Sequence, residues 1–581
     1  MPLDRSGRVP GTVPLYVERA AGRGSGTIFA LAGGPGQAGT TLTGNFASDL
    51  SGSRSGQLIV LDQRGTGKSG LLNCPELERQ RRNDTPLDGR AAVCARRLGE
   101  RRHLYTTRDS VEDIEAVRRR IGAGKISLLG VSYGTKVALA YALRYPANVE
   151  RLVLDSVVAP EGQDIFDLDT FAAMPRVLRE ICRGECARVT PDPAADVATL
   201  VDRMAVAPLR GAFYDSRGRA RQVSLSRRGL YNMIRAGDGL DELRIAYPAA
   251  VRSAVEGDPA PLLRLEHRFD ESGARGPEIE PRPQDLSVTL STATLCEETP
   301  LPWERTTPFA QRPAAARAAA AAVPDARFEP FDRATTLASR GDTLTSCMRW
   351  PAAPEAPALG PGPLPDVPVL VLEGAEDLRT PLEVGARVAA RFARSEVVAV
   401  PKTAHAVLGR AGGCAELAVR RFFAGQAVGN PCAARRRGAR VLPKLPARLS
   451  DVPAAPGVPG RVGRTLAAVG LTLRDLYSEY DQLNSIGEHP AGGGLRGGRF
   501  RVRGGDLVAE GFTLVPGVRV GARVGLSRRP AGTVTVSGPV AGTLALSRTG
   551  RLTGMLGGRR VALSLGRCSG HCPALGSDSD L

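Results

Sequence analysis

The pentapeptide Gly-Val-Ser-Tyr-Gly at residues 130–134 lies between an apolar run, KISLL, and a helix-forming run, TKVALAYAL. Glycine on both sides of the serine permits a tight turn from a strand into a helix, because small residues are needed where the segments cross closely. Such a turn holds the serine hydroxyl above the edge of a sheet, beside the first amides of the helix. An ordinary turn serine is the alternative, but the flanking runs favour Ser132 as a nucleophile.

Strand-like and helix-like segments alternate through the first 158 residues. The apolar runs TIFAL, QLIVL, KISLL and VERLVL read as strands, and SVEDIEAVRRRIG has a helical period. Ser110 and Asp113 are spaced as a capping box, which predicts where that helix begins. The alternation favours an α/β fold with a mainly parallel sheet and flanking helices.

The alternation stops and later resumes, so an insertion interrupts one sheet. Between about 160 and 355 the segments look helical and are joined by polar, Pro-rich connections, whereas strands return at DVPVLVLEGAED. A Pro- and Arg-rich linker and short alternating runs separated by glycine follow. The predicted divisions are the first part of an α/β core at 1–158, a helical cap insertion at 159–355, the second part of the core at 356–432, a linker at 433–463 and a small β-rich C-terminal domain at 464–581.

A serine hydroxyl needs a base to become a strong nucleophile, and the chain has five histidines. His405 follows the resumed strand SEVVAV, lies on a loop and comes after Ser132 in the chain. It is therefore the predicted base, with an incidental loop histidine as the alternative. The other four histidines lack this placement at a strand end: His103, His267, His489 and His571.

The acid of a Ser-His-acid triad is expected after a strand and before the histidine. Asp377, at the end of VLVLEGAED, fits this order and would hold the tautomer of His405. Other carboxylates also stand near strand ends, and the sequence leaves them open as alternatives: Glu373, Glu376 and Asp155.

The oxyanion of an acyl-transfer reaction needs backbone N–H donors. One predicted donor is Tyr133, the residue directly after the nucleophile, and the other comes from GGPGQAG at 33–39, where Gly34 is the candidate. Glycine in this segment lets the backbone approach a substrate closely. A glycine turn without such a role is the alternative.

Charge and motif patterns argue against nucleic-acid, nucleotide and metal sites. The net charge is +18, but the arginines are scattered along the chain rather than gathered in one motif. The segment GTGKSG lacks the first glycine of a phosphate-binding loop, because that position holds Asp62. Cys568, His571 and Cys572 lack a second pair of zinc ligands nearby. We expect no metal and no cofactor.

The cysteines indicate an oxidising compartment. Their number, ten, is even, and they fall into near neighbours along the chain. The chain opens with MPLDRSGRVPG, without the basic and apolar segments of a leader, so either a leader is missing or the cysteines stay reduced. We favour a missing leader and a secreted or envelope-associated protein. No apolar run approaches the roughly 20 residues of a membrane-spanning helix.

Four segments together resemble the α/β-hydrolase superfamily, and within it the proline iminopeptidase and tripeptidyl aminopeptidase group: GGPGQAG, DQRGTGKSG, GVSYGT and GAEDLRTP with TAHAVL. The resemblance covers about residues 1–432 and implies an α/β-hydrolase fold whose insertion caps the site. Secreted members have cysteines placed like Cys74/Cys94, Cys296/Cys347 and Cys414/Cys432. The chain departs from the group at Ala32, where a histidine is usual, and at Ala406, where glycine is frequent.

The resemblance implies an exported serine aminopeptidase that cleaves short peptides from a free amino terminus. Acidic cap residues bind the substrate ammonium in such enzymes, and Glu298, next to Glu297, matches that position better; a solvated acidic pair is the alternative. A carboxylic ester hydrolase with the same triad is a second hypothesis, since the fold does not separate the two. A secreted binding protein with a vestigial hydrolase domain is the third. The function and partner of the C-terminal domain stay open.

Overall fold

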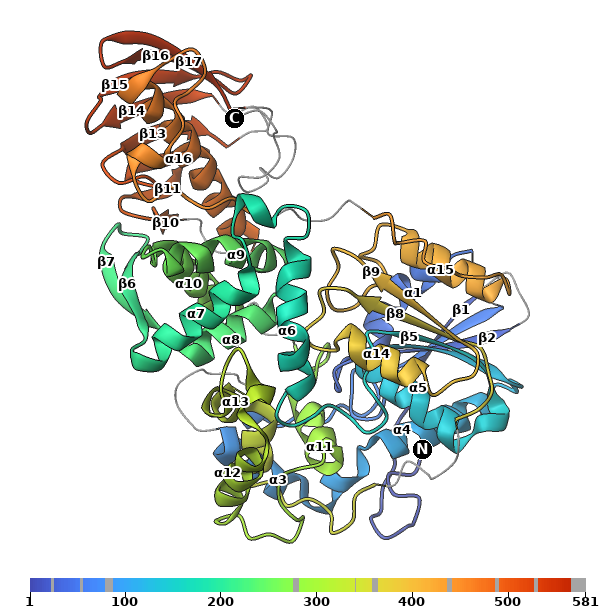
Figure 1. Ribbon diagram of the computed structural model, residues 1–581. Coiled ribbons are helices and arrows are strands. Elements are labelled where there is room, and N and C mark those ends of the chain that lie inside the picture. The colour runs from blue at the N-terminus through green and yellow to red at the C-terminus, as the bar shows by residue number, and fades with distance from the viewer. Residues whose placement is uncertain are drawn as a thin grey trace. The chain divides into compact units, whose positions relative to one another are not determined.

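The computed structural model divides into two compact units (Figure 1). The first comprises Met1–Ile181, Arg235–Leu240 and Glu280–Gly438, and the second comprises Cys182–Ile234, Asp241–Ile279 and Ala439–Leu581. The structure describes every residue outside the following ranges: 22–25, 53–55, 79–86, 275–281, 340, 358–363, 436–440, 486–490, 527–530 and 566–581.

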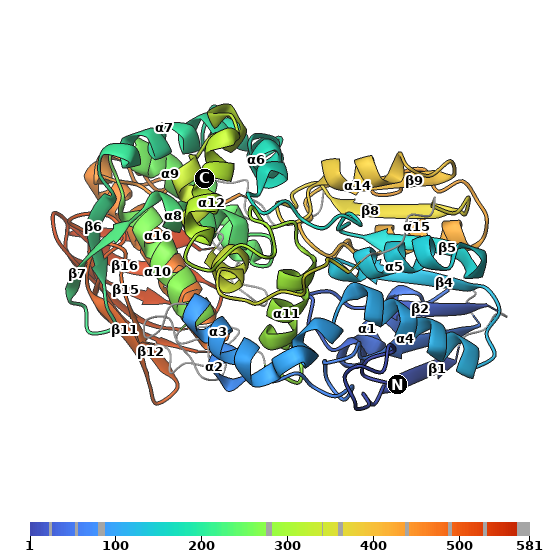
Figure 2. The same ribbon diagram turned by 90° about the horizontal axis from the view of Figure 1, so that it is seen from below.

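A seven-stranded sheet forms the centre of the first unit, in the order β1-β3-β2-β4-β5-β8-β9. Figure 2 labels these strands with the exception of β3. β1 runs antiparallel to β3, and all the other neighbours are parallel. The mainly parallel sheet predicted from the sequence is therefore confirmed, with the long insertion between β5 and β8. The strands are β1 Val17–Ala21, β2 Thr27–Leu31, β3 Gln57–Leu61, β4 Ile126–Val131, β5 Val149–Asp155, β8 Val369–Gly374 and β9 Ser395–Val400.

Helices cover both faces of this sheet. Apolar residues of α4, α5 and α14 form one core with the strands, and those of α1 and α15 form a second core on the other face. Every residue of β2 and β8 is buried, as a parallel sheet between two helical layers requires. The helices are α1 Thr43–Asp49, α4 Thr107–Arg120, α5 Tyr133–Arg144, α14 Leu382–Ala389 and α15 Cys414–Phe423.

Further helices of the first unit come from the segment before α4 and from the insertion. They are α2 Pro75–Glu78, α3 Leu87–Leu98, α6 Leu168–Ile181, α11 Val288–Glu298, α12 Arg312–Ala322 and α13 Arg333–Ser339. A separate apolar core joins α2, α3 and α11 around Trp350, and two disulfides lie within it.

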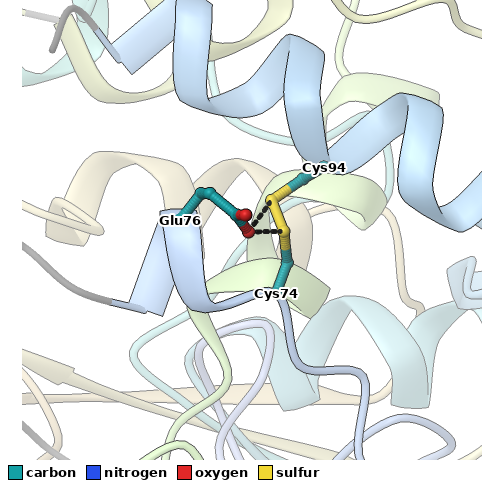
Figure 3. Close-up of side chains that lie close together, drawn as sticks. All are labelled: Cys74, Glu76 and Cys94. Carbon is teal, nitrogen blue, oxygen red and sulfur yellow. Dashed lines mark hydrogen bonds between the residues drawn. A yellow bond between two sulfur atoms is a disulfide. The ribbon is translucent and has the colours of Figure 1, made fainter.

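The described residues contain four disulfides: Cys74–Cys94, Cys182–Cys186, Cys296–Cys347 and Cys414–Cys432. Glu76 approaches the first of these, with Oε2 2.9 Å from Sγ of Cys74 (Figure 3). Both sulfurs are bonded to each other, so this cluster does not offer thiolate ligands to a metal. Cys568, His571 and Cys572 lie outside the described residues. Within the described part of the chain, no helix combines the length and the apolarity needed to span a bilayer.

The second unit combines part of the insertion with the C-terminal region. The insertion contributes the helices α7 Pro193–Val206, α8 Arg227–Ala236, α9 Asp241–Val255 and α10 Ala260–Ala274, and also a hairpin of β6 Leu209–Tyr214 and β7 Ala220–Leu225 that was not predicted. Arg264 of α10 donates two hydrogen bonds, of 2.8 and 2.7 Å, to Asp475 of the long helix α16, Gly460–Ser485. Because both side chains are buried, this pair fixes α10 against α16.

An eight-stranded antiparallel sheet with strands in sequence order completes the second unit. One side of this sheet packs with α16 in a single apolar core, which confirms the β-rich C-terminal region expected from the sequence. The strands are β10 Ala491–Gly493, β11 Arg499–Arg503, β12 Asp506–Phe512, β13 Arg519–Gly525, β14 Gly532–Ser537, β15 Gly542–Leu546, β16 Arg551–Leu556 and β17 Arg559–Ser564.

Helix α4 begins earlier than the sequence indicated. Its N-cap is Thr106, whose side chain accepts from the N–H of Asp109, and Asp109 in turn accepts from the N–H of Thr106. The predicted capping box of Ser110 and Asp113 was wrong, because both residues lie inside the helix. Asp113 instead binds Arg64.

Arg64, in the segment DQRGTGKSG, forms a fully buried ion pair. Its Nε and Nη2 donate to the two carboxylate oxygens of Asp113, each at 2.7 Å, and its Nη1 donates to the carbonyls of Leu3 and Leu104. The side chain of Arg64 is 0% exposed and that of Asp113 is 1% exposed. Arg64 of this motif therefore holds α4 to the N-terminal segment.

Replacement of Arg64 by methionine should destabilise the chain strongly, because it leaves the Asp113 carboxylate buried without its main partner. We expect the free energy of unfolding to fall by about 3–5 kcal/mol. Arg144→Met, which breaks an exposed pair with Glu112, is the matched control and should change stability little. Urea unfolding of both variants measures this, and equal effects would contradict the structural role.

Candidate active site

Ser132 occupies a sharp bend between β4 and α5, with a backbone φ of 55° and ψ of −124°. Few residues with a side chain adopt a positive φ, and such strain is typical of a nucleophile turn. A Cβ added at Gly130 would lie 2.5 Å from the carbonyl of Gly134, and one at Gly134 would lie 2.2 Å from the carbonyl of Leu31. Both glycines of the motif are thus required by close backbone packing.

The GGPG loop lies directly against this serine. A Cβ added at Gly33 would stand 3.0 Å from Cβ and 3.5 Å from Oγ of Ser132. Gly34 and Gly36 have φ values of 110° and 106°, which side-chain-bearing residues rarely adopt. The N–H of Tyr133 belongs to the first turn of α5, where amides lack a partner within the helix. The GGPG loop and the start of α5 therefore both lie against Ser132.

His405 and Asp377 are in contact at the same end of the sheet. Nδ1 of His405 lies 2.9 Å from Oδ2 of Asp377 and 3.0 Å from the hydroxyl of Thr380. The N–H groups of Arg379 and Thr380 donate to Oδ1 of Asp377 at 2.7 and 2.9 Å. Burial opposes the charge on Asp377, but His405 and these donors outweigh it and lower its pKa. With Nδ1 donating to the carboxylate, Nε2 of His405 is left as the basic nitrogen.

The end of β5 holds both the serine turn and the histidine loop. The carbonyl of Asp155 accepts from the N–H of Ser132, and its carboxylate accepts from the N–H groups of Val407 and Leu408, each at 2.9 Å. The hydroxyl of Ser156 accepts from the N–H of Ala406, also at 2.9 Å. Two adjacent residues therefore fix segments that lie far apart in the chain.

The alternative acids have other partners. The carboxylate of Asp155 binds the backbone after His405, as described, and burial raises its pKa. Glu373 accepts from the N–H of Val157 at 2.9 Å, and burial together with Asp377 raises its pKa well above the ordinary value. Glu376 is buried after β8, where its N–H donates to the carbonyl of Thr403. Asp377 is the carboxylate that hydrogen-bonds to the ring of His405.

Two of the remaining histidines also have described surroundings. His103 binds Glu297, and the ring of His267 lies against that of Phe213. His489 and His571 lie outside the described residues.

A cavity of about 370 Å³ lies beside the acid loop; Arg379 and Thr380 line it, whereas Ser132, Asp377 and His405 do not. Its walls come from the segment that follows β5 and from the start of α14, and Thr380 links it to His405. Gly162 also lines the cavity, and a Cβ there would lie 3.6 Å from Nζ of Lys136. Charged residues of the wall are largely paired, as in the ion pair of Glu161 with Arg391 at 2.7 Å.

Glu297 has its hydrogen-bonding capacity filled by the chain itself. The carboxylate contacts Nδ1 of His103 at 2.8 Å, accepts from Nε1 of Trp350 at 3.0 Å and accepts from the N–H of Ala353 at 2.9 Å. The side chain is 1% exposed. Glu297 therefore stabilises the insertion around Trp350, and a substrate ammonium would have to displace these donors.

Glu298 points to a different set of partners beside α5. Its Oε2 accepts from Nζ of Lys136 at 2.8 Å and from the hydroxyl of Thr107 at 2.7 Å, and its Oε1 accepts from the N–H of Thr107. The hydroxyl of Thr107 is also 2.7 Å from that of Tyr133, the residue after Ser132. Glu298 thus lies near the nucleophile turn, but a cation of the chain already balances its charge.

Asp238, a residue that the sequence did not indicate, lies beside the acid loop. It follows α8, in a short segment that belongs to the first unit, and its Oδ1 accepts from the N–H of Leu378 at 3.0 Å. The residue is 1% exposed, and Oδ2 has no hydrogen-bond partner among the described residues. Burial and the neighbouring charge of Asp377 raise the pKa of Asp238 to about 7. In the sequence, GDGL looks like a simple turn.

Comparison with known proteins agrees with this architecture. The family described as "alpha/beta hydrolase fold" matches residues 33–181, and the family described as "TAP-like protein" matches residues 335–431. The two matches contain the serine turn and the acid and histidine loops. The chain has the α/β-hydrolase fold. This confirms the resemblance drawn from the four sequence segments.

The hydrolase is similar to peptidases over part of its length. It is 28% identical over 191 residues to the tripeptidyl aminopeptidase of Streptomyces lividans, which is 29% of this chain and 36% of that protein. It is 28% identical over 167 residues to the proline iminopeptidase of Neisseria meningitidis, 29% of this chain and 44% of that one. It is 34% identical over 74 residues to the serine protease Hip1 of Mycobacterium bovis, which is 12% of this chain and 14% of that protein. The hydrolase therefore spans less than half the length of these relatives.

Replacement of Asp238 by asparagine should change how the stability of the hydrolase depends on pH. An aspartate in the unfolded chain loses its proton near pH 4, whereas folded Asp238 keeps it to about pH 7. The folded state therefore binds more protons in this window, so Asp238 makes stability fall as pH rises through it. Asp238→Asn removes this titration. The free energy of unfolding of the variant minus that of the natural chain should therefore increase as pH is raised from about 4 to about 7.

Urea unfolding at several pH values across this window measures the difference. Asp202→Asn, at an exposed carboxylate, is the control and should show no such trend. A stability difference for Asp238→Asn that stays constant with pH would contradict the buried, protonated state.

Proposed function

We propose that this hydrolase is an exported serine aminopeptidase that releases short peptides from a free amino terminus. The contact of His405 with Asp377, at the end of the sheet where Asp155 holds the Ser132 turn, is the observation that carries the proposal. The peptidases among its relatives support a peptide substrate. The four disulfides of the described residues support export, because disulfides persist in oxidising compartments.

The chemistry follows from the roles of the three side chains. Oγ of Ser132 attacks the carbonyl carbon of the scissile bond, and Nε2 of His405 takes the hydroxyl proton. Asp377 holds Nδ1 and stabilises the imidazolium that forms. The N–H groups of Tyr133 and Gly34 bind the oxyanion. The tetrahedral intermediate expels the amine, which receives the proton from His405, and water then releases the acyl group from Ser132 by the same steps.

Recognition of a free amine falls to Glu298 in this proposal. Glu297 is enclosed by its donors, whereas Glu298 stands beside Tyr133 through Thr107. Lys136 pairs with the Glu298 carboxylate and holds it at a fixed position. A substrate ammonium would share or replace that contact.

The same pair favours a second candidate, a carboxylic ester hydrolase. Lys136 already neutralises Glu298, so a neutral substrate needs no counter-charge at this wall. Triad and oxyanion loop would act on an ester as on an amide, with an alcohol as the leaving group. The two candidates differ only in whether Glu298 contributes to substrate binding.

Replacement of Ser132 by alanine removes the nucleophile and should lower kcat on tripeptidyl and aminoacyl fluorogenic amides by a factor on the order of 10⁶. Ser48→Ala, at an exposed serine of α1, is the control and should keep full activity. A fluorophosphonate probe should label the natural chain and the control but not Ser132→Ala. Retained activity of Ser132→Ala, or no labelling of the folded natural chain, would exclude the proposed mechanism.

Glu298→Gln separates the two candidate substrates. If Glu298 binds the ammonium, KM for free-amine peptides should rise by about tenfold or more, while KM for the N-acetylated peptides and for esters stays unchanged. The double variant Lys136→Met/Glu298→Gln leaves no unpaired charge and should show the same selectivity. Glu304→Gln, at an exposed acid of the insertion, is the control. If Glu298→Gln changes KM equally for free-amine and N-acetylated peptides, the result would favour the ester hydrolase.

A further inference from the structure

The side of the C-terminal sheet that faces away from α16 has a regular, exposed surface. Residues of β13–β17 alternate between a buried set, which packs with α16, and an exposed set. We call this exposed set the outer face. Its residues include Thr533, Thr535, Thr543, Ala545 and Thr553 on the middle strands, with Arg519 on β13, Arg551 on β16 and Arg560 on β17.

The middle of the outer face is flat and rich in hydroxyl groups. Thr535 pairs with Thr543 across β14 and β15, and Ala545 pairs with Thr553 across β15 and β16. Neighbouring strands lie about 4.8 Å apart, so these short side chains form close, even rows. Each threonine hydroxyl can donate one hydrogen bond and accept others. The surface suits an extended polar chain that lies across the strands.

The charged side chains between residues 513 and 565 are all positive. Residues 513–565 contain eight arginines and no aspartate, glutamate or lysine. Arg519, Arg551 and Arg560 are exposed, and within the described residues none of them has an ion pair. Other arginines of the sheet are paired: Arg523, also on the outer face of β13, with Asp506 at 2.8 Å, and Arg499 with Glu510 at 2.7 Å. Exposed guanidinium groups without partners favour a ligand that brings carboxylates, which they bind through two parallel hydrogen bonds.

The side chains of the outer face disfavour other polyanions. Residues 513–565 include no aromatic residue, whereas single-stranded nucleic acids bind through aromatic stacking. A flat sheet face does not enter a duplex groove as a helix or a two-stranded ribbon does. Of the large apolar side chains, Met555 is exposed on β16, so little apolar surface is available to insert into a membrane. Hydroxyl and guanidinium groups together match a carboxylated sugar polymer.

We propose that the outer face of β13–β17 binds an acidic polysaccharide, with its arginines on the carboxylates and its threonines on the sugar hydroxyls. This binding is independent of the proposed peptidase activity, since the outer face and the triad belong to different units. It gives the C-terminal region the role of holding the hydrolase on a carboxylated polymer.

The test uses the chain of 581 residues, titrated with polygalacturonate in an isothermal calorimeter. We expect binding that weakens as salt rises, because the contacts are exposed ion pairs. The triple variant Arg519→Gln/Arg551→Gln/Arg560→Gln should bind about tenfold more weakly. The control Arg101→Gln/Arg120→Gln/Arg410→Gln loses the same charge at exposed arginines of the first unit and should bind as the natural chain does.

A second variant, Thr543→Glu, tests the middle of the face without removing an arginine. It places a carboxylate in the threonine rows and should also weaken binding about tenfold by repulsion. Neutral dextran, oligothymidylate and phosphatidylglycerol vesicles are the comparison ligands. The proposal would be overturned if the control triple variant lost as much affinity for polygalacturonate as the test variant. It would also be overturned if oligothymidylate or the vesicles bound as tightly as polygalacturonate. Peptidase activity should be unchanged in all three variants.

Discussion

The buried carboxylate of Asp155 is the interaction on which the site depends. It ends β5 and accepts two backbone N–H groups from the loop after His405, while its own carbonyl holds the N–H of Ser132. Burial raises the pKa of Asp155, and the backbone donors oppose that effect. A parallel sheet brings strand ends to one edge but does not fix the loops that leave them. The carboxylate supplies that constraint, because it crosslinks two loops at the level of the backbone.

Motifs that look chemical in this chain have structural roles as well. In DQRGTGKSG, Asp62 accepts from the N–H groups of Thr40 and Lys68, at 2.8 and 2.9 Å, and Arg64 is buried against Asp113. A Cβ at Gly67 would lie 2.3 Å from the Asp62 carboxylate. The glycines and charges of the segment thus fold a tight loop at the end of β3. This explains why the segment resembles a phosphate-binding loop without its first glycine.

Strand-end positions were predictable from the sequence, but partner choice was not. The alternation of strands and helices was enough to predict the sheet and to place Ser132, Asp377 and His405 after strands. Four carboxylates satisfied the order rule for the acid, and only side-chain direction separates them: Asp155 and Glu373 turn to backbone amides, while Asp377 reaches the ring. Contacts such as that of Asp238 with Leu378 join segments 140 positions apart, and no local pattern encodes them.

Charge balance beside the Ser132 turn would limit how selective the proposed peptidase site can be for amines. Lys136 is tethered on α5, so its ammonium is always present next to Glu298, whereas a substrate ammonium must leave water and lose motion to compete. Exchange of one ammonium for another gains little Coulomb energy, unlike the filling of an unpaired carboxylate. A substrate amine would therefore gain most where it contacts Glu298 without displacing Lys136. Under the proposed function, selectivity for amines would therefore depend on Lys136 as much as on the Glu298 that it holds.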